Sequence, residues 1–173
     1  MALTIYTIGH STHSEEDFIE MLKAHGIQLL VDVRTIPKSR HNPQFNNDAL
    51  EKSLQASGIV YQHIPALGGL RHTKRDSMNQ AWENASFRGF ADYMQTTEFE
   101  EGLLLLISSA EKQKAVIMCA EAVPWRCHRS LIADALLIRD ITIMDIMSRT
   151  AAKPHALTPW AEVHGIKVTY PKK

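Results

Sequence analysis

Short apolar runs alternate along this chain with longer segments whose apolar residues recur every three to four positions. The runs are rich in β-branched residues and end at polar or glycine residues, which is typical of strands covered on both faces. The expected strands are residues 3–8, 28–33, 59–64, 114–119 and 141–146. The expected helices are residues 14–26, 46–56, 78–112 with interruptions near Gly89 and Thr96, and 127–139.

Most successive strands are separated by ten or more residues of helix, and such strands pair in parallel through right-handed crossovers. The sequence therefore predicts an α/β fold with three layers, in which a mostly parallel, Rossmann-like sheet has helices on both faces. The chain is 173 residues long and shows neither an internal repeat nor a low-complexity linker. We therefore expect a single α/β domain over residues 1–173.

Composition excludes some classes of protein without indicating a function. The chain is 45% hydrophobic and has a formal net charge of zero, so its average charge is not that of a nucleic-acid-binding protein. The N-terminal segment lacks a signal-peptide pattern, and apolar runs such as residues 103–107 are too short to span a bilayer. Cys119 and Cys127 are expected to be unpaired thiols, because a proline and a helix start lie between them. We expect a cytoplasmic protein with no membrane partner.

In open α/β sheets, ligands bind beyond the carboxyl ends of the parallel strands, so the residues after each strand are candidates for a site. Polar, charged and glycine residues occupy these positions. They are Gly9, His10 and Ser11 after the first strand, Asp32, Arg34, Ser39 and Arg40 at and after the second, Gly68, Gly69 and Arg71 after the third, and Cys119, Glu121, Arg126, Cys127, His128 and Arg129 after the fourth. We expect these segments to form one cleft at that edge.

The uneven distribution of charge favours an anion site there. Residues 33–47 and 65–75 contain arginines and lysines but no acidic residue. The helix that starts near Cys127 would point free N–H groups at an anion, and Arg126 and Arg129 would add positive charge. The alternative is that the two basic segments are ordinary solvated loops. The glycines match neither a dinucleotide fingerprint nor a P-loop, so the sequence predicts no cofactor.

Cys119 also has features of a nucleophile, because a thiol at a strand end that faces arginines and a helix N-terminus has a lowered pKa. Six residues separate it from Arg126, a longer spacing than that of cysteine phosphatases or rhodaneses, so the spacing argues against both classes. The alternative for Cys119 is burial as a small apolar residue. We predict no metal site, because its ligands would have to come from distant loops. The available side chains are Cys119, Cys127, His128, His10 and Glu121.

Four ordered motifs resemble the family called domain of unknown function 488 along nearly the whole chain. They are T-I-G-H-S at residues 7–11, V-D-V-R-x-x-P-x-S at 31–39, Y-x-x-x-P-x-L-G-G at 61–69, and C-x-E followed by C-H-R within 119–129. A late Pro-His pair is shared as well, which adds His155 to the candidate ligand-binding residues. The family commonly has a histidine where this chain has Asp145, so a role for that histidine does not carry over. The resemblance implies a compact α/β fold with the motifs gathered at one site, and no particular reaction.

The leading interpretation is an enzyme or a binding protein for a phosphate-bearing ligand, either a nucleotide or a nucleic-acid-derived molecule. Arginines would hold the anion with two histidines nearby, namely Arg34, Arg40, Arg126 and Arg129 with His10 and His128. Asp32 and Glu121 would be acid–base or ribose-binding carboxylates, or else members of structural ion pairs. Two alternatives stay open: a transferase or phosphatase-like enzyme that depends on Cys119, and a non-catalytic module that binds nucleic acid. The sequence decides neither whether the protein is an enzyme nor its oligomeric state.

Overall fold

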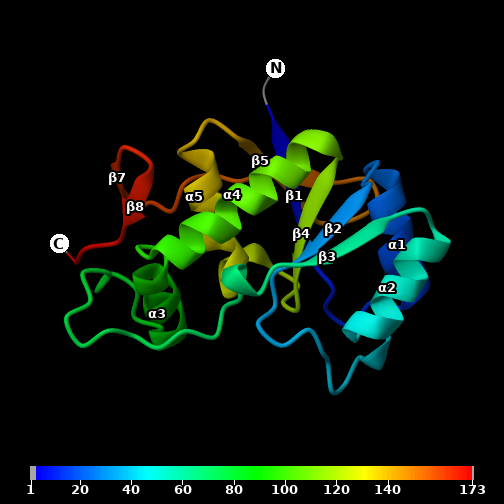
Figure 1. Cartoon of the computed structure of the whole chain (residues 1–173), viewed down its shortest axis with the longest axis horizontal. Helices are drawn as coiled ribbons and strands as arrows, with labels where there is room; N and C mark the ends of the chain where they lie inside the picture. Colours follow the sequence, from blue (N-terminus) through cyan, green and yellow to red (C-terminus); the bar gives the residue numbers. More distant parts are fainter. Residues whose placement is uncertain (1–2, 173) are drawn as a thin grey trace.

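The computed structural model describes residues 3–172, which form a six-stranded sheet with helices on both faces (Figure 1). The strands of this sheet are β1 (Thr4–Gly9), β2 (Leu29–Asp32), β3 (Val60–His63), β4 (Ala115–Cys119), β5 (Thr142–Ile146) and β6 (Ala152–Pro154). The α-helices are α1 (Glu15–Ala24), α2 (Asn47–Ala56), α3 (Ala85–Tyr93), α4 (Thr97–Lys112) and α5 (Arg129–Leu137). Three short 3-10 helices are η1 (Pro43–Phe45), η2 (Pro65–Leu67) and η3 (Pro124–Arg126). The expected three-layer α/β fold is confirmed.

The order of the strands decides which loops become neighbours. The order is β3-β2-β4-β1-β5-β6, in which β1 to β5 run parallel and β6 is antiparallel to β5. Although β4 follows β3 in the chain, it lies between β2 and β1. The carboxyl ends of β2, β4 and β1 are therefore side by side at one edge of the sheet.

Alternate residues of the central strands face two different helical layers. In β2, Leu29 and Val31 belong to the apolar cluster that includes α3, α4 and α5, whereas Leu30 belongs to the cluster with α1 and α2. In β4, Ile117 faces the first layer and Val116 the second. Both faces of each strand are thus apolar, and this produces the continuous apolar runs in the sequence.

Local signals fix the helix ends as expected. The Ser14 hydroxyl accepts a hydrogen bond from the backbone N–H of Asp17 at 3.1 Å and so caps α1. Gly26 and Gly58 follow α1 and α2 with φ angles of 71° and 75°, a left-handed conformation that glycine adopts at low cost. Thr96 caps α4 through its side chain. The expected interruption of the long helical segment at Thr96 is therefore confirmed.

The segment 78–112 differs from the expectation in two ways. Residues 78–84 form no helix, and Gly89 lies inside α3 instead of breaking it. A Cβ atom at Gly89 would lie 2.2 Å from the carbonyl oxygen of Arg71, so this glycine permits close packing of the helix against a loop. Asn79 is fully buried and accepts a hydrogen bond from the Tyr170 backbone N–H at 2.9 Å. This tertiary contact holds its segment outside the helix.

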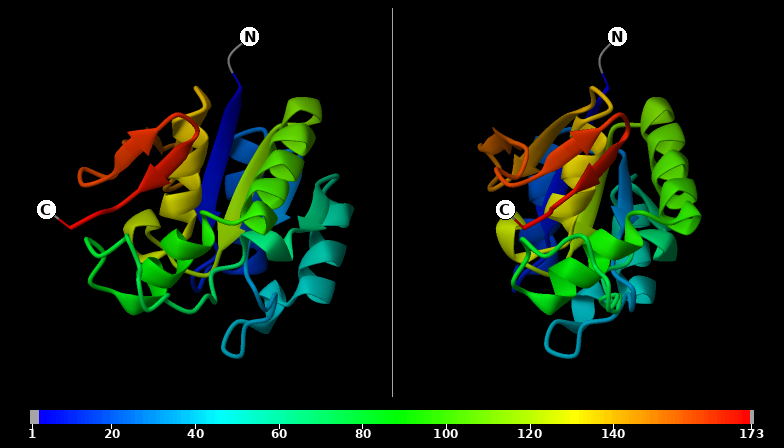
Figure 2. Two further views of the ribbon diagram at one scale, coloured as in Figure 1. Left: turned by 60° about the vertical axis from the view of Figure 1, so that its left-hand side comes forward. Right: turned by 90° about the vertical axis from the view of Figure 1, so that its left-hand side faces the viewer.

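The C-terminal region contains a small hairpin that the sequence pattern does not indicate. Strands β7 (Glu162–His164) and β8 (Lys167–Thr169) pair in antiparallel fashion, and Figure 2 shows this hairpin beside α5. Gly165 forms the tip with a φ angle of 65°. Each strand has only three residues, too few for a two-residue alternation to stand out.

Candidate functional site

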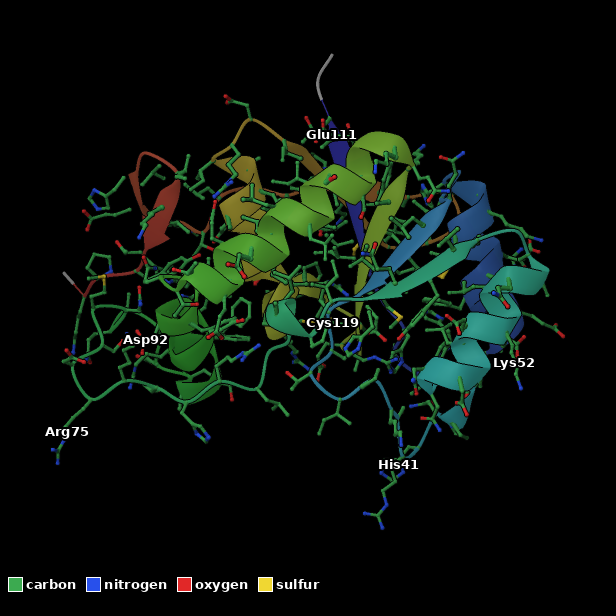
Figure 3. All side chains as sticks on the ribbon, viewed as in Figure 1. His41, Lys52, Arg75, Asp92, Glu111 and Cys119 are labelled. Carbon is green, nitrogen blue, oxygen red and sulfur yellow. A yellow bond between two sulfur atoms is a disulfide. The ribbon has the colours of Figure 1, made fainter. Side chains whose placement is uncertain are left out.

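The strand register brings the motif segments together at one edge. Cys119 is paired with Gly9 on one side, and its predecessor Met118 is paired with Asp32 on the other. Asp32 is in turn paired with His63 of β3. Figure 3 shows Cys119 at the carboxyl end of the sheet and Glu111 at the opposite end. The ends of β2 and β4, which the sequence predicts to share an edge, therefore do so.

Gly9 lets the loop after β4 lie directly on the end of β1. The backbone N–H groups of His10 and Ser11 donate to the carbonyl oxygens of Cys119 and Ala120, each at 2.9 Å. A Cβ atom at Gly9 would lie 1.5 Å from the carbonyl oxygen of Glu121. The absence of a side chain is thus a requirement for the shape of this edge.

Asp32 and Arg34 form an enclosed ion pair. The Arg34 guanidinium donates to both carboxylate oxygens of Asp32, at 2.9 Å from Nε and 2.7 Å from Nη2, and also to the carbonyl oxygen of Phe45. The Tyr61 hydroxyl donates to Asp32 at 2.7 Å. Burial raises the pKa of Tyr61, and this hydrogen bond raises it further. Asp32 is fully buried and Arg34 nearly so. This geometry supports the structural ion pair over a role for Asp32 as a general acid or base.

Replacing Asp32 with asparagine is expected to lower the free energy of unfolding by about 3–5 kcal/mol, because Arg34 is then left as a buried charge without its partner. Urea denaturation followed by circular dichroism measures this change. The matched control is Asp76→Asn at an exposed position, which should change stability by less than about 0.5 kcal/mol. An Asp32→Asn protein as stable as the control would contradict the structural role.

The two candidate histidines at this edge are neutral hydrogen-bonding groups. His10 stacks on the ring of Phe45 at 4.4 Å and donates from Nδ1 to the Ser11 carbonyl oxygen. His128 donates from Nε2 to the carbonyl oxygens of Val33 and Leu67, at 2.8 Å and 3.1 Å. Burial lowers the pKa of each imidazole to about 4. Neither histidine therefore adds positive charge for an anion at neutral pH.

Arg129 points inward, not at a ligand. Its guanidinium donates to the carbonyl oxygens of Glu121 and Ala122, at 3.1 Å and 3.2 Å, and to the sulfur of Cys119 at 3.2 Å. It is fully buried, and burial lowers its pKa to about 10, so it stays charged at neutral pH. Arg129 holds the loop after β4 in place, and the anion-binding role expected for it is not supported by this geometry.

The two cysteines are paired, and the expectation of unpaired thiols is wrong. Their sulfur atoms are joined as a disulfide between residues whose Cα atoms lie 7.1 Å apart. The proline in the intervening segment begins η3, which turns the chain back so that Cys127 lies over the end of β4. Both cysteines are almost completely buried. In residues 3–172, no group of three or more histidine, cysteine or acidic side chains could hold a metal ion.

A cavity of about 300 Å³ lies over this edge, and seven of the candidate residues line it. We call this cavity the motif pocket. The predicted site residues that line it are Arg34, Gly69, Cys119, Glu121, Arg126, Cys127 and His128. Lys38, which lies in the basic segment after β2 but is not among the predicted ligand-binding residues, also lines it. A Cβ atom at Gly69 would lie 2.7 Å from the His128 ring, so this glycine admits the imidazole into the wall.

Other candidates lie outside the motif pocket. Ser39 accepts a hydrogen bond from the Asn42 backbone within its own loop, and the exposed Arg40 is not among the lining residues. Arg71 stacks over the Tyr93 ring at 3.6 Å and donates to the carbonyl oxygens of its own loop. Gly68 packs against Thr35. His155 lies in a separate cavity, bound to Asp134 at 2.8 Å.

Comparison with known proteins gives one match. The family model described as "Domain of unknown function DUF488" matches residues 14–136, a range that includes the motifs in β2, η2 and the β4–α5 loop. Searches of the curated proteins and of the solved structures give no significant match. Among residues 3–172, no helix has both the length and the apolar character that crossing a membrane requires.

Proposed function

The chain belongs to the DUF488 family, a domain of unknown function, and we propose that its motif pocket binds a phosphate-bearing ligand. The observation that carries this proposal is the gathering of unused positive charge and hydrogen-bond donors in one cavity. Lys38 and Arg126 line the pocket, are exposed, and form no ion pair with any other described residue. Charged donors of this kind bind phosphate oxygens more strongly than neutral ones.

Backbone groups add to this charge. The N–H groups of Ala120, Glu121 and Ala122 donate to no acceptor in the described part of the chain. Helix α5 begins at Arg129 beside the same loop. Its first N–H groups are already bonded, that of Arg129 to the Cys127 sulfur and that of Ser130 to the Cys127 carbonyl oxygen, so the helix adds only the positive end of its dipole. Successive free N–H groups in the loop, together with the positive end of the helix dipole, favour an anion.

Glu121 is the one carboxylate among the residues that line the motif pocket. Because Asp32 is enclosed by Arg34 and Tyr61, Glu121 takes over both roles considered for the two acids: acid–base catalysis or acceptance of a ribose hydroxyl. A phosphate ester with hydroxyl groups, such as a nucleotide, supplies a phosphate for the positively charged side chains and a hydroxyl group for Glu121.

The exchange Arg126→Ala is expected to weaken the binding of inorganic pyrophosphate at least tenfold, since a charge-assisted contact is worth about 1.5–3 kcal/mol. Isothermal titration calorimetry measures the affinity, and the melting temperature should not change because Arg126 is exposed. Arg129→Ala should instead lower the melting temperature, because it removes buried bonds to the loop carbonyl oxygens. The matched control is Lys52→Ala, an exposed cation on α2.

Two results would contradict the proposal. Failure of pyrophosphate to bind the unmodified protein at millimolar concentration would rule out the anion site. An Arg126→Ala protein with the affinity of the Lys52→Ala control would show that the pocket is not where the anion binds. If single-stranded oligonucleotides bind instead, with an affinity that falls steeply with salt, the non-catalytic nucleic-acid module is favoured.

The Cys119-dependent alternative has two contacts of Arg129 in its favour. The Arg129 guanidinium lies 3.2 Å from the Cys119 sulfur, and the Arg129 backbone N–H lies 3.4 Å from the Cys127 sulfur. Both contacts stabilise a thiolate once the pair is reduced. This alternative requires reduction of the disulfide, and alkylation of the reduced protein should then abolish any turnover.

A further inference from the structure

Arg129 is a buried charge that has no carboxylate partner. It is fully buried, it stays charged at neutral pH, and it forms no ion pair with any residue in the range 3–172. Its Nε has no hydrogen-bond acceptor there either. The guanidinium contacts two backbone carbonyl oxygens and the Cys119 sulfur, and of these three groups only the sulfur can become an anion. A buried charge is costly unless an opposite charge lies beside it, so Arg129 favours a thiolate at Cys119.

The second sulfur of the disulfide has different surroundings. The Cys127 sulfur accepts from the Arg129 backbone N–H at 3.4 Å and lies 3.5 Å from Nδ1 of His128. Because Nε2 of this neutral imidazole donates to two carbonyl oxygens, Nδ1 carries no hydrogen and is an acceptor. A full charge stabilises an anion more than one neutral N–H group does. Reduction of the disulfide therefore gives Cys119 as the thiolate and Cys127 as a thiol whose S–H can donate to His128.

Both sulfurs are reached from the motif pocket. Cys119 and Cys127 line this cavity, although their residues are only 2% and 4% exposed. A small molecule that enters the cavity can meet them, whereas a disulfide on the surface of another folded protein cannot. Lys38 and Arg126, both exposed, line the same cavity and attract negatively charged molecules.

We propose that Cys119 and Cys127 are a reversible dithiol–disulfide couple that exchanges electrons with a small, negatively charged thiol or disulfide in the motif pocket. This activity goes beyond the binding of a phosphate-bearing ligand and has in common with it only the two exposed cations of the pocket. It also differs from group transfer by Cys119, because no group of the substrate stays on the protein.

The exchange has two steps. The Cys119 thiolate attacks one sulfur of the substrate disulfide, whose S–S bond breaks and releases the first substrate thiolate. The Cys127 thiol then attacks the Cys119 sulfur of the mixed disulfide, and its proton goes to the second substrate thiolate as that group leaves. The substrate disulfide has then gained two electrons, and the two cysteines have lost them in forming their own disulfide. Two substrate thiols reduce the pair by the reverse steps.

Glutathione is the probe for the first test, because it is a small thiol with a net negative charge. Millimolar reduced glutathione is expected to reduce the disulfide in the native protein, and glutathione disulfide should form it again. The reason is that Arg129 stabilises the reduced pair, whereas purely structural disulfides resist reduction by glutathione. Alkylation of the free thiols followed by mass spectrometry measures both directions. A disulfide that stays intact in the native protein would overturn the proposal. This result does not depend on whether pyrophosphate binds, so the two proposals fail separately.

The charge of the substrate is tested with three disulfides: negatively charged glutathione disulfide, uncharged hydroxyethyl disulfide and positively charged cystamine. Each rate of oxidation of the reduced protein is divided by the rate of the same disulfide with dithiothreitol, which removes differences in intrinsic reactivity. The corrected rate should be about tenfold higher for glutathione disulfide than for cystamine, because the pocket is positively charged. Arg126→Ala should reduce this preference, and the matched control Lys52→Ala should keep it. Equal corrected rates for the three disulfides would overturn the proposed substrate class.

Single-cysteine variants identify the attacking residue. The Cys127→Ser protein should accumulate a mixed disulfide between Cys119 and glutathione, because the second step cannot occur. The Cys119→Ser protein should form its mixed disulfide about tenfold more slowly, since Cys127 has no cationic side chain beside it. If either variant does not fold, limited alkylation of the reduced, unmodified protein at pH 6.5 and peptide mass mapping replace this measurement. Cys119 should carry most of the label, and equal labelling of the two cysteines would overturn its role.

Discussion

The exchange Gly9→Ala is expected to prevent formation of the native edge and to lower the free energy of unfolding by more than about 4 kcal/mol. The new methyl group would lie 1.5 Å from the Glu121 carbonyl oxygen and 2.6 Å from the Arg129 guanidinium. Backbone movement cannot relieve this overlap, because the adjoining N–H groups of His10 and Ser11 are bonded to Cys119 and Ala120. The clash therefore disrupts the β1–β4 contact at the centre of the sheet.

Soluble yield, far-UV circular dichroism and urea denaturation measure the effect. Gly58→Ala is the matched control: its φ angle of 75° makes alanine strained by about 1–2 kcal/mol, but no atom lies within 4 Å of the added Cβ. A Gly9→Ala protein that unfolds at the same urea concentration as Gly58→Ala would show that the loop after β4 does not lie against Gly9.

A second large effect is expected from acid. The pKa values of His10 and His128 are lowered by burial from 6.5 to about 4, so the folded protein resists protonation that the unfolded chain accepts. Between pH 6.5 and 4 the unfolded state binds more protons, so the free energy of unfolding should fall as pH falls through this window. Each histidine contributes on the order of 3 kcal/mol at the lower end, and neither contributes a change above pH 6.5.

Urea denaturation at pH 7 and pH 4.5 measures the total loss in the free energy of unfolding. The variants His10→Gln and His128→Gln show how much of this loss each histidine causes. Glutamine keeps a donor but does not titrate, so each variant should lose less stability between the two pH values than the unmodified protein. The same ionisations can be followed directly by NMR. Imidazole signals of His10 and His128 that titrate near pH 6.5 in the folded protein would contradict the expectation.

The sheet was predictable because its strands are short, apolar on both faces and separated by helices with clear capping residues. Ser14, Gly26 and Gly58 act through bonds and angles within a few residues, which a sequence shows directly. The position of β4 between β2 and β1 depends on long-range pairing, and no local pattern encodes it. The non-helical segment around Asn79 likewise depends on a contact with Tyr170, more than 90 residues away in the chain.

At the edge of the sheet, residue types and strand ends indicated which segments meet, but not which side chains face the cavity. Arg126 and Arg129 belong to one motif, yet Arg126 is exposed and Arg129 is fully buried. The spacing of the motif does not separate them, because Arg126 is the last residue of η3 and Arg129 is the first residue of α5. The disulfide was missed because η3 turns the chain back between Cys119 and Cys127.

The place of β4 in the sheet also affects the order in which the protein can form as it is synthesised. Strand β1 has two neighbours, β4 and β5, and residues 115–119 leave the ribosome long after residues 4–9. Until then β2 and β3 can pair with each other, but both edges of β1 lack a partner strand. The emerging chain therefore carries a β-branched N-terminal strand with two unpaired edges through most of translation, a state in which chaperones and premature aggregation compete for the same segment.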